Sequence, residues 1–163
     1  MDTSSQTDEP FLFRFRVRFC ECDPQRVAFN GCYGMYIDLA VLEFMRSLGL
    51  GDALVKGTFD YQVVKQTVEW KGPAHFDDVV EVAVWAKRLG TTSFVIATEF
   101  RIAGSDTVSA TGETVYVLVD SATLTKMSLS PELRQAFQQG ARGLCVDHAN
   151  STPQRPAGGR PAG

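Results

Sequence analysis

The sequence predicts one α+β domain in which a five-stranded antiparallel sheet wraps round one long central helix. Residues 31–48 place apolar side chains on nearly every face of a helical pattern, which is typical of a buried helix. Five further segments alternate in polarity or are rich in β-branched residues, as strands are. The later strands are separated by only a few residues, and connections of that length join antiparallel neighbours.

Length and composition suit an ordinary globular domain. The chain has 163 residues, of which 44% are hydrophobic and 21% charged, with a formal net charge of −3. That charge gives no strong field that would favour nucleic acid or a membrane surface. Residues 1–10 are polar and lack the apolar stretch of a signal peptide, which predicts a cytoplasmic protein. We expect the domain to span residues 11–142, between disordered segments at 1–10 and at 143–163, the latter rich in Pro and Gly.

The cysteines and histidines predict no metal site. The cysteines are Cys20, Cys22, Cys32 and Cys145. They lack the paired C-x-x-C spacing of zinc sites, and without an export signal reduced thiols are favoured over disulfides. His75 and His148 lie far apart and show no ligand spacing.

The first strand is predicted over residues 11–19, where aromatic and aliphatic side chains alternate with Arg14, Arg16 and Arg18. Three arginines on one face could mark a nucleic-acid surface, but the solvated face of an antiparallel strand is the simpler interpretation. The other strands are predicted over residues 59–71, 79–88, 93–102 and 107–120. A short helix is predicted from Ser130-Pro131 to residue 139.

The long helix is predicted over residues 31–48, with Asn30 as its N-cap and Gly49 in the left-handed position after its last turn. The residues with i, i+3, i+4, i+7 spacing are Tyr33, Tyr36, Ile37, Ala40, Val41, Phe44 and Leu48. One sheet covers only part of such a helix. We therefore expect a homodimer or a homotetramer in closed symmetry, with the active site near a subunit boundary.

Asp23 lies in a non-periodic segment just before this helix. Pro24 biases Asp23 towards an extended or turn conformation. A carboxylate therefore lies a few residues upstream of a helix N-terminus, where backbone N–H groups lack helical partners and carry partial positive charge. Asp-Pro is also a common turn signal, so a turn or capping role for Asp23 is the structural alternative.

Three segments resemble one protein family. The first is VRFCECDP at residues 17–24, followed by Val27-Ala28-Phe29 and Tyr33. The second is WKGPAHFDD at residues 70–78. The third comprises GTTSF at residues 90–94 and the closing VLVD at residues 117–120. Together these segments resemble the hot-dog-fold acyl-CoA thioesterases of the 4-hydroxybenzoyl-CoA type over about residues 15–139.

This resemblance implies a hot-dog fold and hydrolysis of a thioester to a free acid and coenzyme A. Asp23 would act as nucleophile or general base, while the N–H groups of Asn30 and Gly31 polarise the carbonyl. Phe29 and Tyr33 are expected beside the substrate. Apart from the resemblance, two interpretations stay open for the cations Lys87 and Arg88: they meet the phosphates of coenzyme A, or they are solvated at the end of a strand. The residues beside them are Thr91, Thr92 and Ser93. Coenzyme A enters as part of the substrate, and no other cofactor is implied.

Two departures from the family pattern keep other functions open. Arg26 stands where the family usually has Gly, and Asn30 where Tyr or His is common. A non-catalytic protein that binds acyl-CoA or an acyl carrier on the same scaffold is therefore the alternative. Glu43, on the helix, is a second candidate for the catalytic acid. A dehydratase on this scaffold would need a histidine at the loop, and neither histidine lies there.

Overall fold

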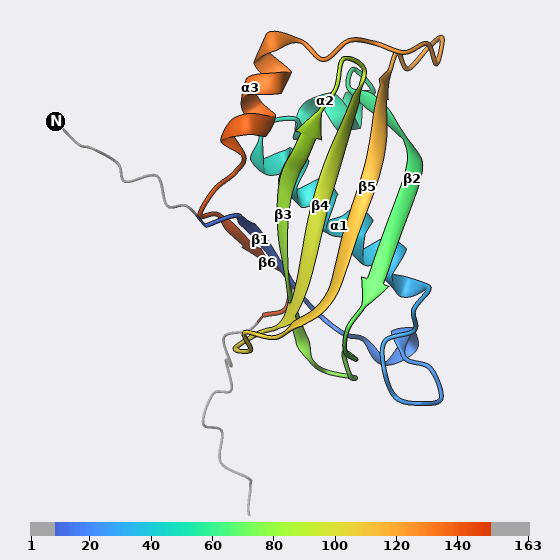
Figure 1. Cartoon of the computed structure of the whole chain (residues 1–163), viewed down its shortest axis with the longest axis vertical. Coiled ribbons are helices and arrows are strands. Elements are labelled where there is room, and N and C mark those ends of the chain that lie inside the picture. Colours follow the sequence, from blue (N-terminus) through green and yellow to red (C-terminus); the bar gives the residue numbers. More distant parts are fainter. Residues whose placement is uncertain (1–8, 151–163) are drawn as a thin grey trace, which may run out of the picture.

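The computed structural model of the chain describes residues 9–150 (Figure 1). Six strands form one sheet: β1 (Phe11–Arg16), β2 (Asp60–Trp70), β3 (Val79–Leu89), β4 (Ser93–Ile102), β5 (Val108–Val119) and β6 (Cys145–Asp147). The helices are η1, a 3-10 turn (Phe19–Glu21), α1 (Cys32–Ser47), α2 (Gly51–Lys56) and α3 (Pro131–Gln139). The strand order is β2-β5-β4-β3-β1-β6, so β2 and β6 are the two edges.

The prediction of five antiparallel strands is corrected by β6. The strands β1 to β5 pair antiparallel, but β6 pairs parallel with β1, which makes the sheet six-stranded and mixed. This strand has three residues and lies at the start of the segment 143–163 that was expected to be disordered. Residues 1–8 and 151–163, the rest of the predicted disordered segments, lie outside the described part of the chain.

α1 packs on one face of the sheet, as Figure 1 shows, and supplies the centre of the core. Its fully buried positions include Ile37, Ala40 and Phe44. The expectation that the helix is buried nearly all round is wrong for the single chain, since Met35 is 41% exposed and Asp38 is also exposed. One sheet can cover only one side of a helix.

The C-terminal end of α1 follows from Gly49, whereas its N-terminus differs from the prediction. Gly49 adopts the left-handed conformation, with φ +83°, and its N–H donates to Arg46 O at 3.0 Å while Leu50 N–H donates to Met45 O at 3.0 Å. This pair of bonds is a Schellman motif, as the glycine predicted. The predicted N-cap is wrong: Gly31 occupies that position, and no side chain caps the helix.

The arginines of the first strand are paired. Arg14 forms an ion pair with Glu81, Arg16 with Asp77 and Arg18 with Glu21. β1 ends at Arg16, so Phe19 leaves the buried face and is 80% exposed. Among residues 9–150, no helix is long and apolar enough to cross a membrane.

Candidate functional site

The loop between η1 and α1 fixes the position of Asp23. The Asp23 N–H donates to Val27 O at 3.0 Å, and the Asp23 carbonyl accepts from Arg26 N–H at 2.9 Å. One carboxylate oxygen, Oδ1, accepts from Gln25 N–H at 2.8 Å. No other hydrogen bond to this carboxylate occurs within residues 9–150, so Oδ2 is available to a ligand or to water.

Arg26 has the backbone conformation that explains the family's usual glycine. Its φ is +63°, in the left-handed region that favours glycine. The substitution therefore leaves the turn in place at a cost of about 1 kcal/mol. The Arg26 side chain is exposed, so the departure from the family pattern does not disturb the core.

The start of α1 offers two free backbone donors. Cys32 N–H donates to Phe29 O at 2.9 Å and Tyr33 N–H donates to Asn30 O at 3.3 Å. The N–H groups of Asn30 and Gly31 have no acceptor in the described part of the chain, as an oxyanion site requires. A Cβ at Gly31 would lie 2.6 Å from the Phe29 ring, so only glycine allows this ring to lie where it does.

Asp23 and Asn30 line one cavity of about 430 Å³, while Gly31 follows Asn30 in the chain but does not line it. Its lining comes from the loop, the first turn of α1 and the end of β2. The lining residues are Asp23, Gln25, Val27, Ala28, Phe29, Asn30, Tyr33, Trp70, Lys71, Gly72 and Pro73. Tyr33 and Trp70 meet edge to face, with ring centroids 5.8 Å apart. Tyr33 and Trp70 therefore give the cavity an aromatic wall, and Lys71 adds a cation.

The residues expected near the phosphates do not reach this cavity in one chain. The Asp23 loop pairs with residues just before β3, through the bridge from Val27 to His75, whereas Lys87 to Ser93 lie at the far end of that strand. β3 has 11 residues and so spans roughly 35 Å at about 3.3 Å per residue. Arg88, Thr91, Thr92 and Ser93 thus surround the turn from β3 to β4.

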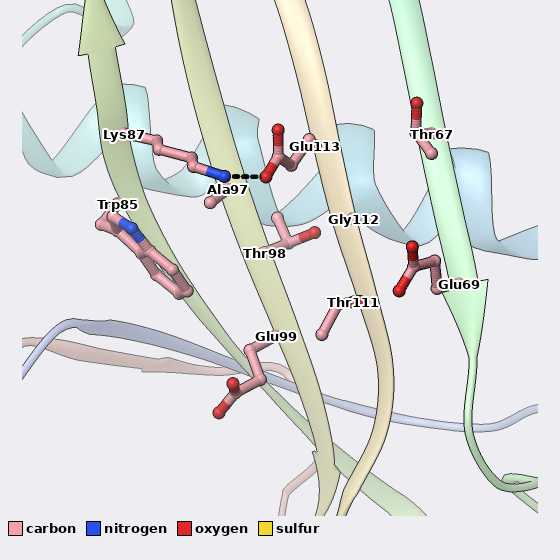
Figure 2. A pocket seen from close by; sticks show the side chains of 10 residues that line it. All are labelled: Thr67, Glu69, Trp85, Lys87, Ala97, Thr98, Glu99, Thr111, Gly112 and Glu113. Atoms are coloured by element: carbon pink, nitrogen blue, oxygen red, sulfur yellow. Dashed lines mark hydrogen bonds and ion pairs between the residues drawn. The ribbon is translucent and has the colours of Figure 1, made fainter.

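Lys87 belongs to a second cavity, on the sheet face that α1 does not cover (Figure 2). This cavity measures about 460 Å³. Figure 2 shows the Lys87 amine directed at Glu113, with which it forms an ion pair, while Trp85, Glu99 and Glu69 surround the space. Alternation along the strand places Lys87 on the same face as Trp85, two residues earlier.

Glu43 and the two histidines do not line the Asp23 cavity. Glu43 pairs with Arg46 on α1 at 3.4 Å and does not line the Asp23 cavity. His75 lies 3.5 Å from Asp78, and the backbone N–H of His75 donates to the same carboxylate. Within residues 9–150, no three His, Cys, Asp or Glu side chains form a group that could hold a metal ion.

Sequence reasoning missed part of the cavity wall. Trp70, Lys71, Gly72 and Pro73 come from the end of β2, about 40 residues beyond the loop in the chain. This stretch begins the segment WKGPAHFDD, one of the three segments that carry the family resemblance. Its position is set by the hydrogen bond from Ala28 N–H to Ala74 O at 2.7 Å.

Comparisons with known proteins show the family of the chain and its fold. Residues 17–137 match the family model of the thioesterase-like superfamily. A curated esterase-like protein of Aquifex aeolicus is 30% identical over 89 residues, which are 54% of this chain and 70% of that protein.

Two solved structures share the fold. The structure of BH1999, a gentisyl-coenzyme A thioesterase, is 26% identical with a TM-score of 0.68, over 78% of this chain and 98% of its own. Slr0204 of Synechocystis, a 1,4-dihydroxy-2-naphthoyl-CoA thioesterase, is 19% identical with a TM-score of 0.70, over 78% of this chain and 95% of its own. The predicted hot-dog fold is therefore confirmed, apart from the extra strand.

Proposed function

Because this chain belongs to the thioesterase-like superfamily, we propose that it hydrolyses acyl-CoA thioesters, with Asp23 as the reacting carboxylate. The class predicted from the sequence, a thioester hydrolase, follows from the family. The choice of Asp23 rests on one observation: Asp23 lines the same cavity as Asn30, whose N–H group, like that of the adjacent Gly31, has no acceptor in the described part of the chain.

The chemistry needs a carboxylate and an oxyanion site. Oδ2 of Asp23 either attacks the thioester carbonyl or takes a proton from an attacking water. The carbonyl oxygen then gains negative charge, which the N–H groups of Asn30 and Gly31 stabilise. Collapse of this intermediate breaks the C–S bond and expels coenzyme A as a thiolate, which takes a proton from the protonated Asp23 or from water. If Asp23 was the nucleophile, water then hydrolyses the acyl-Asp23 anhydride to the free acid. The Gln25 N–H holds Oδ1, so the carboxylate keeps one orientation.

The cavity wall favours a flat acyl group. The side chains of Phe29, Tyr33 and Trp70 line it, and Phe29 and Trp70 are each about half exposed. Aromatic rings stack or meet edge to face with gains of about 0.5–1.5 kcal/mol per pair. We therefore place aromatic acyl-CoA thioesters ahead of short aliphatic ones as substrates.

The carrier is coenzyme A in this proposal, and its binding involves a second copy of the chain. Lys87 and Arg88 lie at the opposite end of β3 from Asp23. These cations and Asp23 can therefore contact the same substrate molecule only if the cations come from another subunit.

Replacing Lys87 and Arg88 by Ala should raise KM several-fold and leave kcat nearly unchanged, because contacts to a non-reacting part of the substrate bind ground and transition states equally. Steady-state kinetics at two salt concentrations measures this, and an unchanged KM would place the phosphates elsewhere.

A panel of acyl-CoA thioesters tests the proposed function directly. Free coenzyme A is followed as released thiol with benzoyl, acetyl and palmitoyl thioesters. We expect turnover, with kcat/KM highest for the benzoyl substrate. Calorimetric binding of the same thioesters without thiol release would instead support the non-catalytic binding protein.

A further inference from the structure

Glu21 is the one buried charged side chain in the described part of the chain, at 5% exposure. It lies on η1, two residues before Asp23. Its Oε2 accepts from Arg18 N–H at 2.8 Å and from the Tyr36 hydroxyl at 2.9 Å. Its Oε1 accepts from Arg18 Nε at 2.7 Å, and a second Arg18 nitrogen lies 2.5 Å away. Both carboxylate oxygens are therefore fully used inside the protein.

The backbone of Glu21 binds the other end of the same loop. Its carbonyl accepts from Phe29 N–H at 2.9 Å and from the Cys32 thiol at 3.7 Å. Phe29 directly precedes Asn30 and Gly31, whose N–H groups open α1. One residue thus connects the Asp23 segment, the two free donors and the body of the helix.

Tyr36 is a rigid anchor for this connection. It is 1% exposed, and its ring lies 4.3 Å from that of Phe15 in the core. Burial raises the pKa of the Tyr36 hydroxyl, and the bond to Glu21 raises it further, so the hydroxyl stays protonated and donates. The loop is therefore tied to a side chain that cannot move without disturbing the core.

We propose that Glu21 is a positioning residue for thioester hydrolysis, holding the Asp23 carboxylate and the Asn30 and Gly31 donors at a fixed separation. The inference rests on the proposed function. Glu21 does not face the Asp23 cavity and touches no substrate, since its carboxylate points to Arg18 and Tyr36. Its contribution is the geometry of the reacting groups, and a displacement of about 1 Å in such groups can cost 100-fold in rate.

Glu21→Gln tests the proposal because it preserves size but turns one acceptor into a donor. Every neighbour of the carboxylate is itself a donor, so the amide leaves at least one bond unmade. We expect kcat for the best acyl-CoA substrate to fall roughly 10–100-fold with KM within twofold. The matched control is Glu81→Gln, which breaks the ion pair with Arg14 on the sheet and should leave kcat within twofold.

Tyr36→Phe is the second variant, and it decides the matter if Glu21→Gln does not fold. It removes one hydroxyl and leaves the pair of Glu21 with Arg18 intact, so kcat should fall several-fold at unchanged KM. The losses in the double variant should be less than additive, because both changes act on the same set of contacts around residue 21. Kinetics within twofold of wild type for either folded single variant, or fully additive losses, would overturn the proposal.

Asp23→Asn separates this proposal from the proposed function. If Asp23→Asn abolishes hydrolysis while Glu21→Gln and Tyr36→Phe turn over normally, the positioning role fails and the function stands. If Asp23→Asn turns over normally, the assignment of the reacting carboxylate fails, and the positioning role fails with it.

Discussion

At the scale of the residue, the unpaired hydroxyl of Thr98 lowers the stability of the folded protein. It is 2% exposed, and its hydroxyl oxygen has no hydrogen-bond partner in the described chain. A buried hydroxyl without a partner costs about 1–3 kcal/mol. The neighbouring Thr114 is equally buried, but its hydroxyl accepts from Gln66 Nε2 at 3.1 Å.

Thr98→Val should therefore stabilise the protein. Valine keeps the shape and removes the unpaired hydroxyl, so we expect the free energy of unfolding to rise by about 1 kcal/mol. Urea denaturation measures this, with Thr114→Val as the control that should lose stability. A loss in Thr98→Val would mean that the hydroxyl has a partner, such as a buried water.

The site was predicted at this scale only where its residues are neighbours in the chain. Asp23, Phe29, Asn30 and Tyr33 lie within 11 positions and line one cavity, as expected. Trp70 and the residues after it come from another strand, and a single sequence does not give the register that brings them there. Lys87 was expected near the substrate, but alternation along β3 places it on the sheet face that α1 does not cover, where it pairs with Glu113, so only another subunit can bring it to the Asp23 cavity.

At the scale of the element, periodicity predicted strands and helices wherever it extended over several turns or residue pairs. β4 and the start of α3 fall where the alternation and the Ser130-Pro131 signal indicated. β6 was missed because three residues show no period, and because its partner β1 lies more than 130 residues earlier in the chain. The N-cap of α1 is Gly31, one residue after the predicted Asn30, and no side chain caps the helix there.

Gly49→Ala tests the left-handed end of α1. The φ of +83° strains any residue with a Cβ, although no heavy atom lies within 4 Å of the position. We expect the variant to lose about 1 kcal/mol of unfolding free energy. Gly72→Ala is the matched control, because its surroundings are also open and its φ is not in the left-handed region. Equal stability of the two variants would show that backbone strain is not the cause.

At the scale of the whole molecule, two surfaces suit a second subunit. β2 is an edge strand on which Val63 is 50% and Val64 59% exposed. The second surface is the outward side of α1, where Met35 is exposed. An uncovered apolar edge favours pairing with another chain. The Asp23 cavity also lies at the end of β2, so a partner on this edge would stand beside it.

Replacing Val63 and Val64 by Lys should therefore disrupt a homodimer or dimer of dimers. Charge on an edge strand opposes pairing, so we expect a smaller particle in light scattering at micromolar concentration, together with lower activity. Leu144→Lys, next to β6 at the opposite edge, should leave both unchanged. A wild-type protein that is a stable monomer under these conditions would contradict the proposed assembly.

The central claim is that Asp23 is the reacting carboxylate of a thioester hydrolase, and the kinetics of Asp23→Asn test it most directly. The variant keeps size and polarity but removes charge and basicity, so kcat should fall by roughly 100-fold or more. Its unfolding free energy should change by less than about 1 kcal/mol, since the side chain lies in a loop. Glu43→Gln is measured beside it and should keep most of the activity. If Glu43→Gln abolished turnover while Asp23→Asn retained it, the chemistry would belong to the helix and not to the loop before it.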